Sequence, residues 1–379
     1  MLLQIESSGH SISAGRFDQY LYPYYKNSID NGSLTREFAQ EILDCIWVKF
    51  NDLNKARDEA SSYGFAGYSL FQNLTAGGQN AEGIDATNDL SFLCIQASMH
   101  TQLPAPSFSV RIWNGTPNEF LIKCAELTRT GVGLPAYYND EVIIPALMSR
   151  GVTLADAREY GIIGCVEPQK PFKTDGWHDA AFFNMCRPLE LVFSNGVDKG
   201  AQISIKTGNV EDMTTFEEFY NAYKAQETYM IGLMVNAINA IDTAHSERVP
   251  LPFLSCMVED CVKEGKTVQE GGAHYNFTGP QGFGIANMAD GLWAVKTLVF
   301  DEKKVTMAEL KDALIHNYGQ GLSPKAAKNA TQEVVINLAK AGKSVNESQV
   351  ADICRMFLTG EQDPTKRKRY EEILGEKCL

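Results

Sequence analysis

A cysteine and a glutamate lie two positions apart in the stretch GIIGCVEPQKPFKTDGWHDAAFFN, residues 161–184. Cys165 follows an apolar run, and Glu167 comes two residues later, directly before a proline. His178 and Asp179 follow within the same stretch. A thiol beside a carboxylate base, with a second acid/base pair nearby, is the set of groups that thiol-dependent catalysis uses.

The apolar run before Cys165 predicts a short buried strand over residues 161–167. Its two glycines allow the backbone to turn sharply or to approach a ligand closely. Pro168 is expected to end strand pairing just after Glu167. Because alternate side chains of a strand face the same side, Cys165 and Glu167 are expected to point into one cavity.

Two other interpretations of these residues remain open on spacing alone. An arbitrary Cys-x-Glu sequence is more often a buried structural cysteine beside a solvated glutamate. Cys165 is alternatively a thiolate nucleophile whose pKa is lowered by His178, although the apolar run favours a neutral thiol and no cysteine-protease signature occurs. His178 and Asp179, taken alone, are typical of a structural pair.

Composition narrows the class of protein. The chain has 379 residues, of which 44% are hydrophobic, so it can bury a large core in one to three domains. Its net charge of −13 argues against nucleic acid or an anionic membrane as a partner. No signal peptide is visible, and no apolar segment approaches the roughly 20 residues that span a bilayer. We therefore expect a cytoplasmic protein that binds a small molecule.

Cysteine usage agrees with that location. The nine cysteines are an odd number, are scattered along the chain and include no CxxC spacing. This pattern predicts reduced thiols and neither a disulfide framework nor a metal site.

The coarse pattern of the chain indicates an α/β architecture. Apolar residues at helical spacing predict helices over residues 36–60 and 118–130, whereas strands are expected at residues 107–115, 141–147 and 161–167. Helix starts with capping residues are predicted at Thr153, Thr215 and Thr306, each of which has an acidic residue three positions on. Residues 1–318 are assigned to the main domain, and the polar residues 319–379 to a helical insertion or subdomain.

The stretch GCVEPQKPFKTDGWHDAAFFN resembles the cysteine loop of the glycyl radical enzymes. The similar branch holds dehydratases and lyases, including glycerol and propane-1,2-diol dehydratases, hydroxyproline dehydratase and choline trimethylamine-lyase. Other stretches resemble the same branch, among them IESSGHSISAGRFDQYLYPYY, VRIWNGTP, AHSERVPLPFLSCMVEDC and GGAHYNFTGPQGFGIANMADGLWAVK. The resemblance covers roughly residues 1–315.

The resemblance implies a ten-stranded α/β barrel surrounded by helices, of which this chain supplies a part. It also implies catalytic roles for three residues. Cys165 would carry a transient thiyl radical, Glu167 would be the general base, and Asp179 would hold or protonate a departing hydroxyl group. The resemblance further implies residues of the substrate pocket. His178 would set the charge of Asp179, and the pair His10 and Ser11 would hold a diol. Phe65 and Phe71 would line the pocket wall.

One feature of the family is missing from this sequence. The radical-bearing glycine lies in a motif Arg-Val-x-Gly-Tyr, which does not occur here. FAGYSLF, residues 65–71, is similar but lacks the Arg-Val pair, so Gly67 is rejected as the radical site. The chain also begins inside one family motif and ends before another. We therefore expect the central fragment of a longer enzyme, inactive by itself.

The resemblance also implies partners. The complete enzyme would need the missing N- and C-terminal portions and a separate activating enzyme that uses S-adenosylmethionine and an iron–sulfur cluster to install the radical. The chain itself would bind no cofactor, and the complete enzyme would be a homodimer, free in the cytoplasm or inside a bacterial microcompartment. The expected substrate is a small alcohol.

The substrate remains open among several alcohols. GWHD and the His10–Ser11 pair favour a diol, with choline or hydroxyproline as alternatives. A non-catalytic remnant is a further alternative, since the radical motif is absent. Acyl transfer of the pyruvate formate-lyase kind is disfavoured, because that enzyme uses adjacent cysteines and Val166 follows Cys165 here.

Overall fold

The structure of the chain is a computed structural model that describes most of the sequence. The described residues are residue 6, residues 11–53, 59–64 and 71–315, and scattered residues between 331 and 353. His10, Phe65 and Gly67 lie outside them, as does nearly all of the segment 319–379 that was assigned to a separate subdomain.

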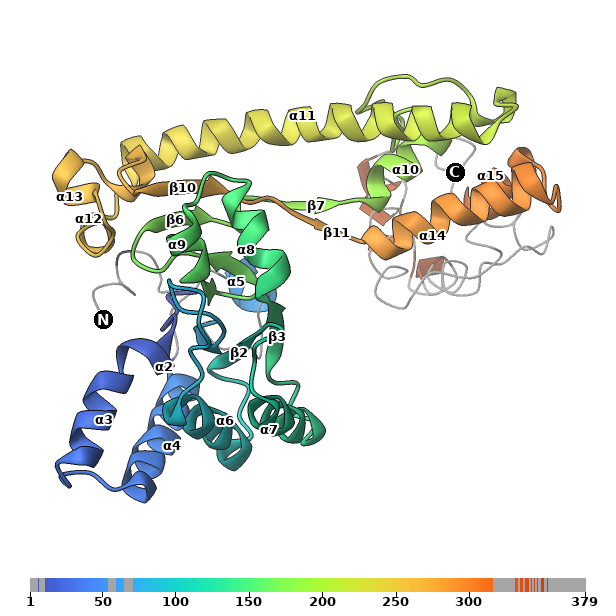
Figure 1. The fold of residues 1–379 in the computed structure, drawn as a ribbon. Coiled ribbons are helices and arrows are strands. Elements are labelled where there is room, and N and C mark those ends of the chain that lie inside the picture. The colour runs from blue at the N-terminus through green and yellow to red at the C-terminus, as the bar shows by residue number, and fades with distance from the viewer. Residues whose placement is uncertain are drawn as a thin grey trace. The chain divides into compact units, whose positions relative to one another are not determined.

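The chain forms two compact units, each built from two segments (Figure 1). The first unit joins Met1–Phe182 to Asn236–Gln281, and the second joins Phe183–Val235 to Gly282–Leu379. The chain passes from one unit to the other within β7 (Phe182–Asn184), α11 (Phe216–Arg248) and β11 (Gln281–Phe283). Every described residue of the predicted site falls in the first unit.

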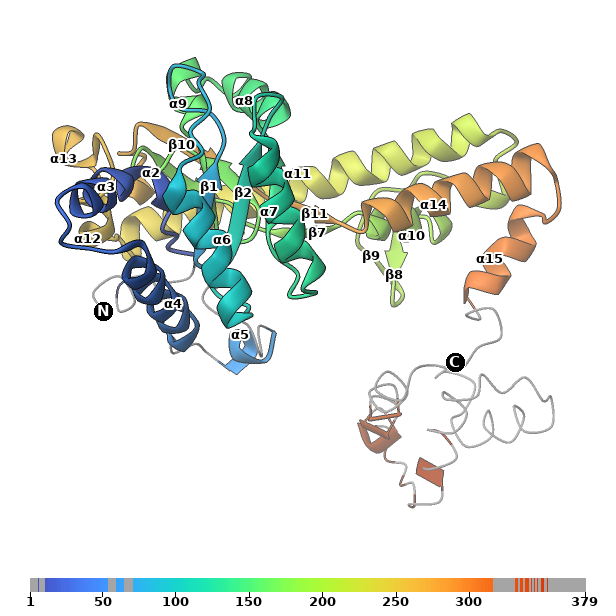
Figure 2. The same cartoon turned by 60° about the horizontal axis from the view of Figure 1, so that its bottom comes forward.

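The first unit contains a parallel three-stranded sheet in the order β1-β2-β3. Its strands are β1 (Asn73–Gly77), β2 (Ser107–Ile112) and β3 (Ala136–Asn139). α6 (Asp89–Thr101) connects β1 to β2 and α7 (Asn118–Arg129) connects β2 to β3, which is the crossover that parallel strands require. Figures 1 and 2 show both helices on one side of the sheet.

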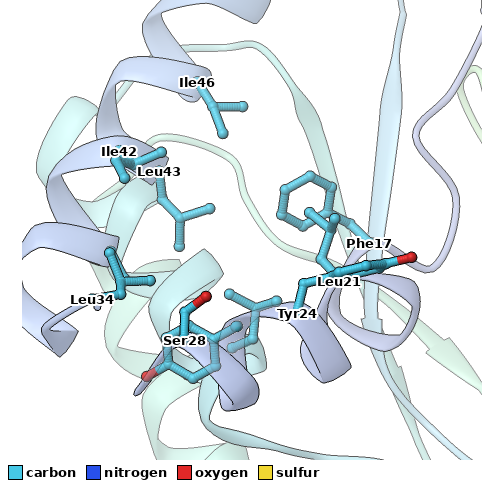
Figure 3. A pocket seen from close by; sticks show the side chains of 11 residues that line it. Phe17, Leu21, Tyr24, Ser28, Leu34, Ile42, Leu43 and Ile46 are labelled. Carbon is cyan, nitrogen blue, oxygen red and sulfur yellow. The ribbon is translucent and has the colours of Figure 1, made fainter. Parts of the chain in front are cut away.

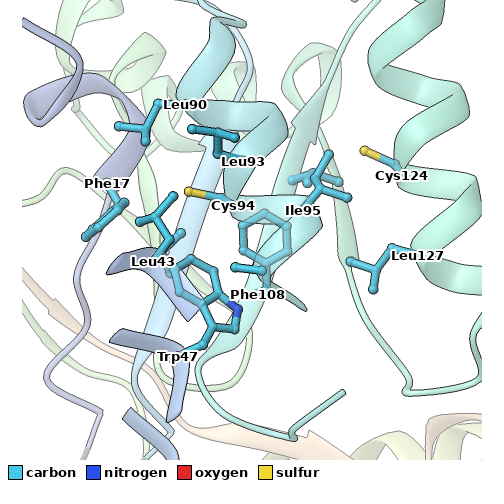
Figure 4. Packing of buried hydrophobic residues seen from close by; sticks show 14 of the residues in the cluster. Phe17, Leu43, Trp47, Leu90, Leu93, Cys94, Ile95, Phe108, Cys124 and Leu127 are labelled. Atoms are coloured by element: carbon cyan, nitrogen blue, oxygen red, sulfur yellow. The ribbon is translucent and has the colours of Figure 1, made fainter. Parts of the chain in front are cut away.

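A hydrophobic core lies between this sheet and the helices (Figure 4). α4 (Arg36–Asp52) contributes Ala39, Leu43 and Trp47, whose spacing of four residues places them on one face of the helix. Trp47 is 1% exposed, and its Nε1 donates a hydrogen bond of 2.8 Å to Ser98 Oγ on α6. The apolar periodicity therefore accounts for how α4 packs.

The remaining elements of the first unit are short. They are α2 (Phe17–Tyr20), α3 (Tyr22–Asp30), α5 (Glu59–Gly64), α8 (Asp140–Met148), α9 (Leu154–Arg158), α12 (Pro252–Ser255), α13 (Cys261–Glu264) and the 3-10 turn η2 (Val268–Glu270). β4 (Gly161–Ile163) and β5 (Glu167–Gln169) form an antiparallel hairpin, and β6 (Thr174–Trp177) pairs in parallel with β10 (Tyr275–Thr278). This hairpin and this strand pair carry the predicted catalytic residues.

A buried ion pair fixes the base of the hairpin. Arg111 on β2 and Asp140 at the start of α8 are both 0% exposed, and their side chains form two hydrogen bonds of 2.8 and 2.9 Å. Arg111 also donates to the backbone oxygen of Tyr160, the residue before β4, and Tyr160 Oη donates to Asp140. Removing one partner would leave a buried unpaired charge, at a cost of about 3–5 kcal/mol.

The second unit is mainly helical within the part that is described. Besides its share of α11 it holds α10 (Cys186–Phe193), β8 (Val197–Asp198), β9 (Ala201–Gln202), the 3-10 turn η1 (Val210–Asp212), α14 (Ile285–Val295), the π-helix η3 (Lys296–Asp301) and α15 (Met307–Ile315). Val192, Phe219 and Val295 are among the residues of its core. This unit therefore has a core of its own.

An apolar pocket of about 230 Å³ lies between α3 and α4 of the first unit (Figure 3). Leu21, Ile42 and Ile46 are among the side chains that line it, and its polar groups are the hydroxyls of Tyr24, Tyr25 and Ser28. Because it offers neither a carboxylate nor an imidazole, it supplies no catalytic acid or base.

Several predicted elements are confirmed. The predicted helix at 118–130 is α7, the predicted strand at 107–115 is β2, and α4 occupies residues 36–52 of the helix predicted over 36–60, of which residues 54–58 lie outside the description. Thr153, Thr215 and Thr306 each accept a hydrogen bond from the backbone of the residue three positions on. Helix starts are therefore encoded locally here.

Two predictions about strands were wrong. Residues 141–147 belong to α8, because Asn139 caps the backbone N–H of Glu141 and Asp140 is held by the buried ion pair. The predicted strand at 161–167 is interrupted by a turn, and Pro168 does not end the pairing but lies opposite Ile162 in the hairpin. A two-stranded hairpin tolerates this proline because each strand has an unpaired edge.

Candidate active site

Cys165 lies in the tight turn Gly164–Val166 that joins β4 to β5. Gly164 has a φ of +59°, and a Cβ at this position would lie 2.7 Å from Ser11 Oγ and 3.0 Å from Glu167 Oε2. A side chain here would therefore be strained and would collide with two polar groups. Glycine at 164 lets the turn that carries the thiol approach Ser11 closely.

Hydrogen bonds tie this turn to the parallel sheet. Ser13 Oγ accepts from the backbone N–H groups of Gly164, at 3.0 Å, and Asn73, at 2.9 Å. Asn73 Nδ2 donates to the backbone oxygen of Gly164 at 3.2 Å, and the hydroxyl of Ser13 donates to the backbone oxygen of Ser11 at 3.0 Å. The start of β1 and residues 11–13 thus hold the position of the cysteine.

Glu167 folds back onto the same turn. Its Oε2 accepts a hydrogen bond of 2.8 Å from the backbone N–H of Val166. Burial raises the pKa of Glu167, the hydrogen bond from Val166 opposes that rise, and the charge of Asp179 adds to it. A carboxylate with a raised pKa is a better proton acceptor than an ordinary one.

Cys165 is half-buried beside these carboxylates. Burial raises the pKa of its thiol to about 11, with further contributions from the charges of Glu167 and Asp179. At neutral pH the sulfur therefore keeps its hydrogen. This protonation state suits the exchange of a hydrogen atom and disfavours a thiolate nucleophile.

A cavity of about 170 Å³ adjoins the hairpin. The residues that line it are Ser11, Ile163, Glu167, Gly176, Trp177, His178 and Asp179. It is smaller than the pockets that hold drug-sized ligands, which measure about 300–1,000 Å³. The cavity has the size and the polar groups for a compact, hydroxylated molecule.

His178 is packed between two glycines at one side of this cavity. A Cβ at Gly176 would lie 2.4 Å from its Nε2, and a Cβ at Gly279 would lie 2.6 Å from its Nδ1. Burial lowers the pKa of His178, although the charge of Asp179 opposes that effect. The imidazole is therefore neutral at neutral pH, and it cannot act as the cation that would lower the pKa of Cys165.

The structure brings four predicted residues together around the cavity, namely Ser11, Glu167, His178 and Asp179. Cys165 is on the adjoining turn, and its expected position on a regular strand was wrong. Its proximity to Glu167 results from the hairpin turn and not from strand alternation. Phe71 is described, but it is not among the residues that line the cavity, while His10 and Phe65 lie outside the described residues.

Sequence reasoning missed three residues of this region. Trp177 lines the cavity, and Gln281 donates hydrogen bonds to both Glu167 and Asp179. Tyr138 on β3 is close enough to Glu167 and Cys165 for their charges to raise its pKa, after burial, to about 12. Gln281 had a weak local signal, a polar residue directly after the Gly-Pro turn of FTGPQGFG.

The described part of the chain contains neither a metal-ligating cluster nor a membrane-spanning helix. No group of three or more histidine, cysteine, aspartate or glutamate side chains there has the arrangement of a metal site. None of the helices described is both long and apolar enough to cross a membrane.

The sequence matches the model of one protein family, described as pyruvate formate lyase-like, over residues 1–354. The chain belongs to this family, which confirms the resemblance seen in the cysteine loop. The solved structures that resemble this chain are glycyl radical enzymes with the α/β barrel of that family, so the predicted fold class is also confirmed.

Individual relatives are similar over most of this chain. A structure reported for 1,2-propanediol dehydration in Roseburia inulinivorans is 64% identical, with a TM-score of 0.85, and the match covers 98% of this chain and 44% of that one. The glycerol-bound B12-independent glycerol dehydratase of Clostridium butyricum is 58% identical, with a TM-score of 0.80, over 88% of this chain and 41% of that one.

A third relative is the (2S)-3-sulfopropanediol dehydratase of Klebsiella oxytoca. It is 41% identical over 324 residues, which are 84% of this chain and 39% of that protein. The chain therefore spans about two fifths of the length of the relatives that it matches.

Proposed function

We propose that this chain provides the hydrogen-atom-transfer cysteine and the base of a glycyl radical dehydratase, and that the complete enzyme removes water from a small vicinal diol. The observation that carries the proposal is the hairpin turn, which carries a protonated Cys165 thiol near the Glu167 carboxylate and beside a small polar cavity. Propane-1,2-diol and glycerol are the proposed substrates.

In the proposed reaction the Cys165 S–H bond gives its hydrogen atom to a glycyl radical located in the part of the relatives that this chain does not span. The resulting sulfur radical takes a hydrogen atom from the carbon that bears one hydroxyl group of the diol, and the S–H bond forms again. Glu167 accepts the proton of that hydroxyl group, and the deprotonated carbon radical is a strong electron donor.

The C–O bond at the neighbouring carbon then breaks, and its electron pair leaves with the hydroxide. The hydroxide takes up one proton, which balances the proton that Glu167 has gained, and departs as water. The organic radical takes the hydrogen atom back from Cys165, which leaves an aldehyde and restores the sulfur radical. Diol is thus converted to aldehyde and water without net oxidation.

Asp179 is proposed to hold the departing hydroxyl group and to assist its protonation. It lines the cavity together with Glu167, as this role requires. His178 is the neighbouring neutral imidazole, and Ser11, which lines the same cavity, is proposed to hold a substrate hydroxyl. His10, Phe65 and Phe71 remain predicted pocket residues on the strength of the resemblance alone.

The choice of a diol is supported by the relatives. The two structures that are 64% and 58% identical concern 1,2-propanediol and glycerol respectively. The proposed partners of the complete enzyme are its remaining N- and C-terminal portions, a second copy of itself and a radical-installing activating enzyme. The proposed location is the cytoplasm, free or within a microcompartment.

The test uses the chain completed with the N- and C-terminal portions of the Roseburia inulinivorans relative and activated without oxygen. Cys165→Ser should abolish turnover of propane-1,2-diol but leave the glycyl radical signal in the electron paramagnetic resonance spectrum. The reason is that a serine O–H bond is too strong for a glycyl radical to break.

The matched control is Cys256→Ser, because Cys256 is an exposed cysteine of the same unit. It should keep both turnover and the radical signal. The unsupplemented chain should show neither. Turnover by Cys165→Ser at the rate of the control would remove Cys165 from the mechanism, and turnover of choline or hydroxyproline in place of the diols would replace the proposed substrate.

A further inference from the structure

Gln281 is fixed at the start of β11, next to the strand that follows the candidate site. Its backbone N–H donates a hydrogen bond of 2.8 Å to the oxygen of Ala181, two residues after Asp179. Two residues before Gln281, Gly279 N–H donates to the oxygen of Trp177 at 2.9 Å. The backbone at Gln281 and just before it is therefore aligned with the segment that carries His178 and Asp179.

The side-chain amide of Gln281 bridges the two carboxylates of the site. Its Nε2 donates to Asp179 Oδ1 and to Glu167 Oε1, the second at 3.3 Å, and it lies 3.5 Å from the backbone oxygen of His178. An amide nitrogen carries two hydrogens, so one group can serve both carboxylates. These carboxylates lie 102 and 114 positions earlier in the chain.

The hydrogen bonds from Gln281 leave the two carboxylates in different surroundings. Both oxygens of Glu167 face a donor, because Oε1 accepts from Gln281 and Oε2 accepts from the backbone of Val166. Hydrogen bonds to the ionised form of a carboxyl group favour that form, so these two donors oppose the burial that raises the pKa of Glu167. At Asp179 the amide donates to one oxygen, Oδ1.

We propose that Gln281 is a positioning residue of the catalytic site, whose amide holds Glu167 as the proton acceptor and orients Asp179 for the departing group. The inference rests on the proposed function for what the two carboxylates do, but the bridge itself does not. Without the amide, Glu167 would keep its burial and its repulsion by Asp179 and would lose one of the donors that offset them.

The first test measures the Glu167 carboxyl group directly and needs no turnover. The full chain is labelled with ¹³C at the glutamate side-chain carboxyl carbons, and the Glu167 resonance is identified by its absence from Glu167→Gln. Gln281→Met keeps the size of the side chain and removes both donors, so it should raise the pKa of Glu167. Gln281→Glu adds a third negative charge, so it should raise that pKa further.

Asn276→Leu is the matched control. Asn276 lies on the adjacent strand β10, and its amide donates to the backbone oxygens of Ala273 and Gly271. Removing this amide takes away a donor of the same kind from the same region and should leave the pKa of Glu167 at the wild-type value. Protection of the buried thiols Cys94 and Cys124 from alkylation reports that each variant is folded.

The second test uses the completed, activated enzyme. Gln281→Met should lower kcat about tenfold, the usual size of losing one hydrogen bond to a charged group. It should also move the acidic limb of the kcat/KM profile to higher pH, because the base must be ionised to act. A residue that only supports the fold would lower activity without moving that limb.

The two tests separate the inference from the proposed function. A raised pKa of Glu167 in a completed enzyme that dehydrates no diol would support the bridge and contradict the function. An unchanged pKa in folded Gln281→Met would overturn the bridge even if diols are dehydrated. Should Gln281→Met not fold, Gln281→Glu decides in the same way, and unfolding of both variants would assign Gln281 a purely structural role.

Discussion

The protonation state of Cys165 separates hydrogen-atom chemistry from nucleophilic chemistry, and it can be measured in the chain as it stands. Burial, followed by the charges of Glu167 and Asp179, raises the pKa of this thiol from 9.0 to about 11. At pH 7.5 this difference lowers the thiolate fraction about a hundredfold. A less acidic thiol is intrinsically more nucleophilic, which returns about tenfold of that loss.

The expected result is that iodoacetamide alkylates Cys165 at pH 7.5 at least about tenfold more slowly in the folded chain than in the chain unfolded by urea. The half-buried position slows the reaction further at every pH, so the dependence of the rate on pH is the diagnostic quantity. In the folded chain the rate should still be rising steeply above pH 9. Peptide mass spectrometry follows each cysteine separately, and the fully buried Cys94 and Cys124 report folding.

In Glu167→Gln the alkylation rates of Cys165 in the folded and in the urea-unfolded chain should lie closer together, because the substitution removes a negative charge that disfavours the thiolate. Cys256→Ser, which removes an exposed thiol elsewhere, should leave the Cys165 profile unchanged. Faster alkylation of Cys165 in the folded chain than in urea at pH 7.5 would refute the reasoning. That outcome would mean a stabilised thiolate and would revive the nucleophilic interpretation.

Two further predictions concern aspartates of the same unit. In the completed enzyme, Asp179→Asn should slow the loss of hydroxide roughly a hundredfold but affect the loss of trimethylamine much less, because only hydroxide needs a proton. Steady-state assays with both kinds of substrate measure this difference. Equal losses of activity with both would indicate a binding or structural role. Asp175 is half-buried near Asp242 and Cys261, and its pKa is raised from 3.8 to about 6 by loss of solvation and then by the charge of Asp242. The stability that protonated Asp175 contributes is fully present below pH 3.8 and is lost as pH rises through about 6. Urea unfolding should therefore find Asp175→Asn more stable than wild type by up to about 3 kcal/mol at pH 7.5 and little changed at pH 4. An equal effect at both pH values would mean that the ionisation of Asp175 does not cause the difference in stability.

Local sequence determined the elements whose signals lie within a few residues. The helical spacing of apolar residues predicted the helix at α4, and the structure buries Ala39, Leu43 and Trp47 on one face because a helix places every fourth residue on one side. Thr215 and Thr306 marked helix starts, because a capping side chain bonds to a backbone group three residues away. The cysteine loop, together with the other stretches that resemble the same branch, predicted the family.

Local sequence did not determine whether the short apolar runs form strands or helices. EVIIPAL suits a strand or a helix equally well, and the choice was made by contacts that lie elsewhere in the chain. Asp140 at the start of α8 is bound by Arg111 from β2, which is distant in sequence. The turn at Cys165 likewise depends on Ser13 and Asn73, which pin Gly164 across 151 and 91 positions.

The residue types of the site were determined by the sequence, but their arrangement was decided by the tertiary structure. Cys165, Glu167 and Asp179 were recognisable from one stretch of chain, whereas the partner that connects two of them, Gln281, was not. Its backbone bond to Ala181 and its amide bonds to Glu167 and Asp179 exist only because strands more than 90 positions apart pair in one register. Such pairing depends on the packing of the whole unit, so no pattern within a short window of sequence encodes it.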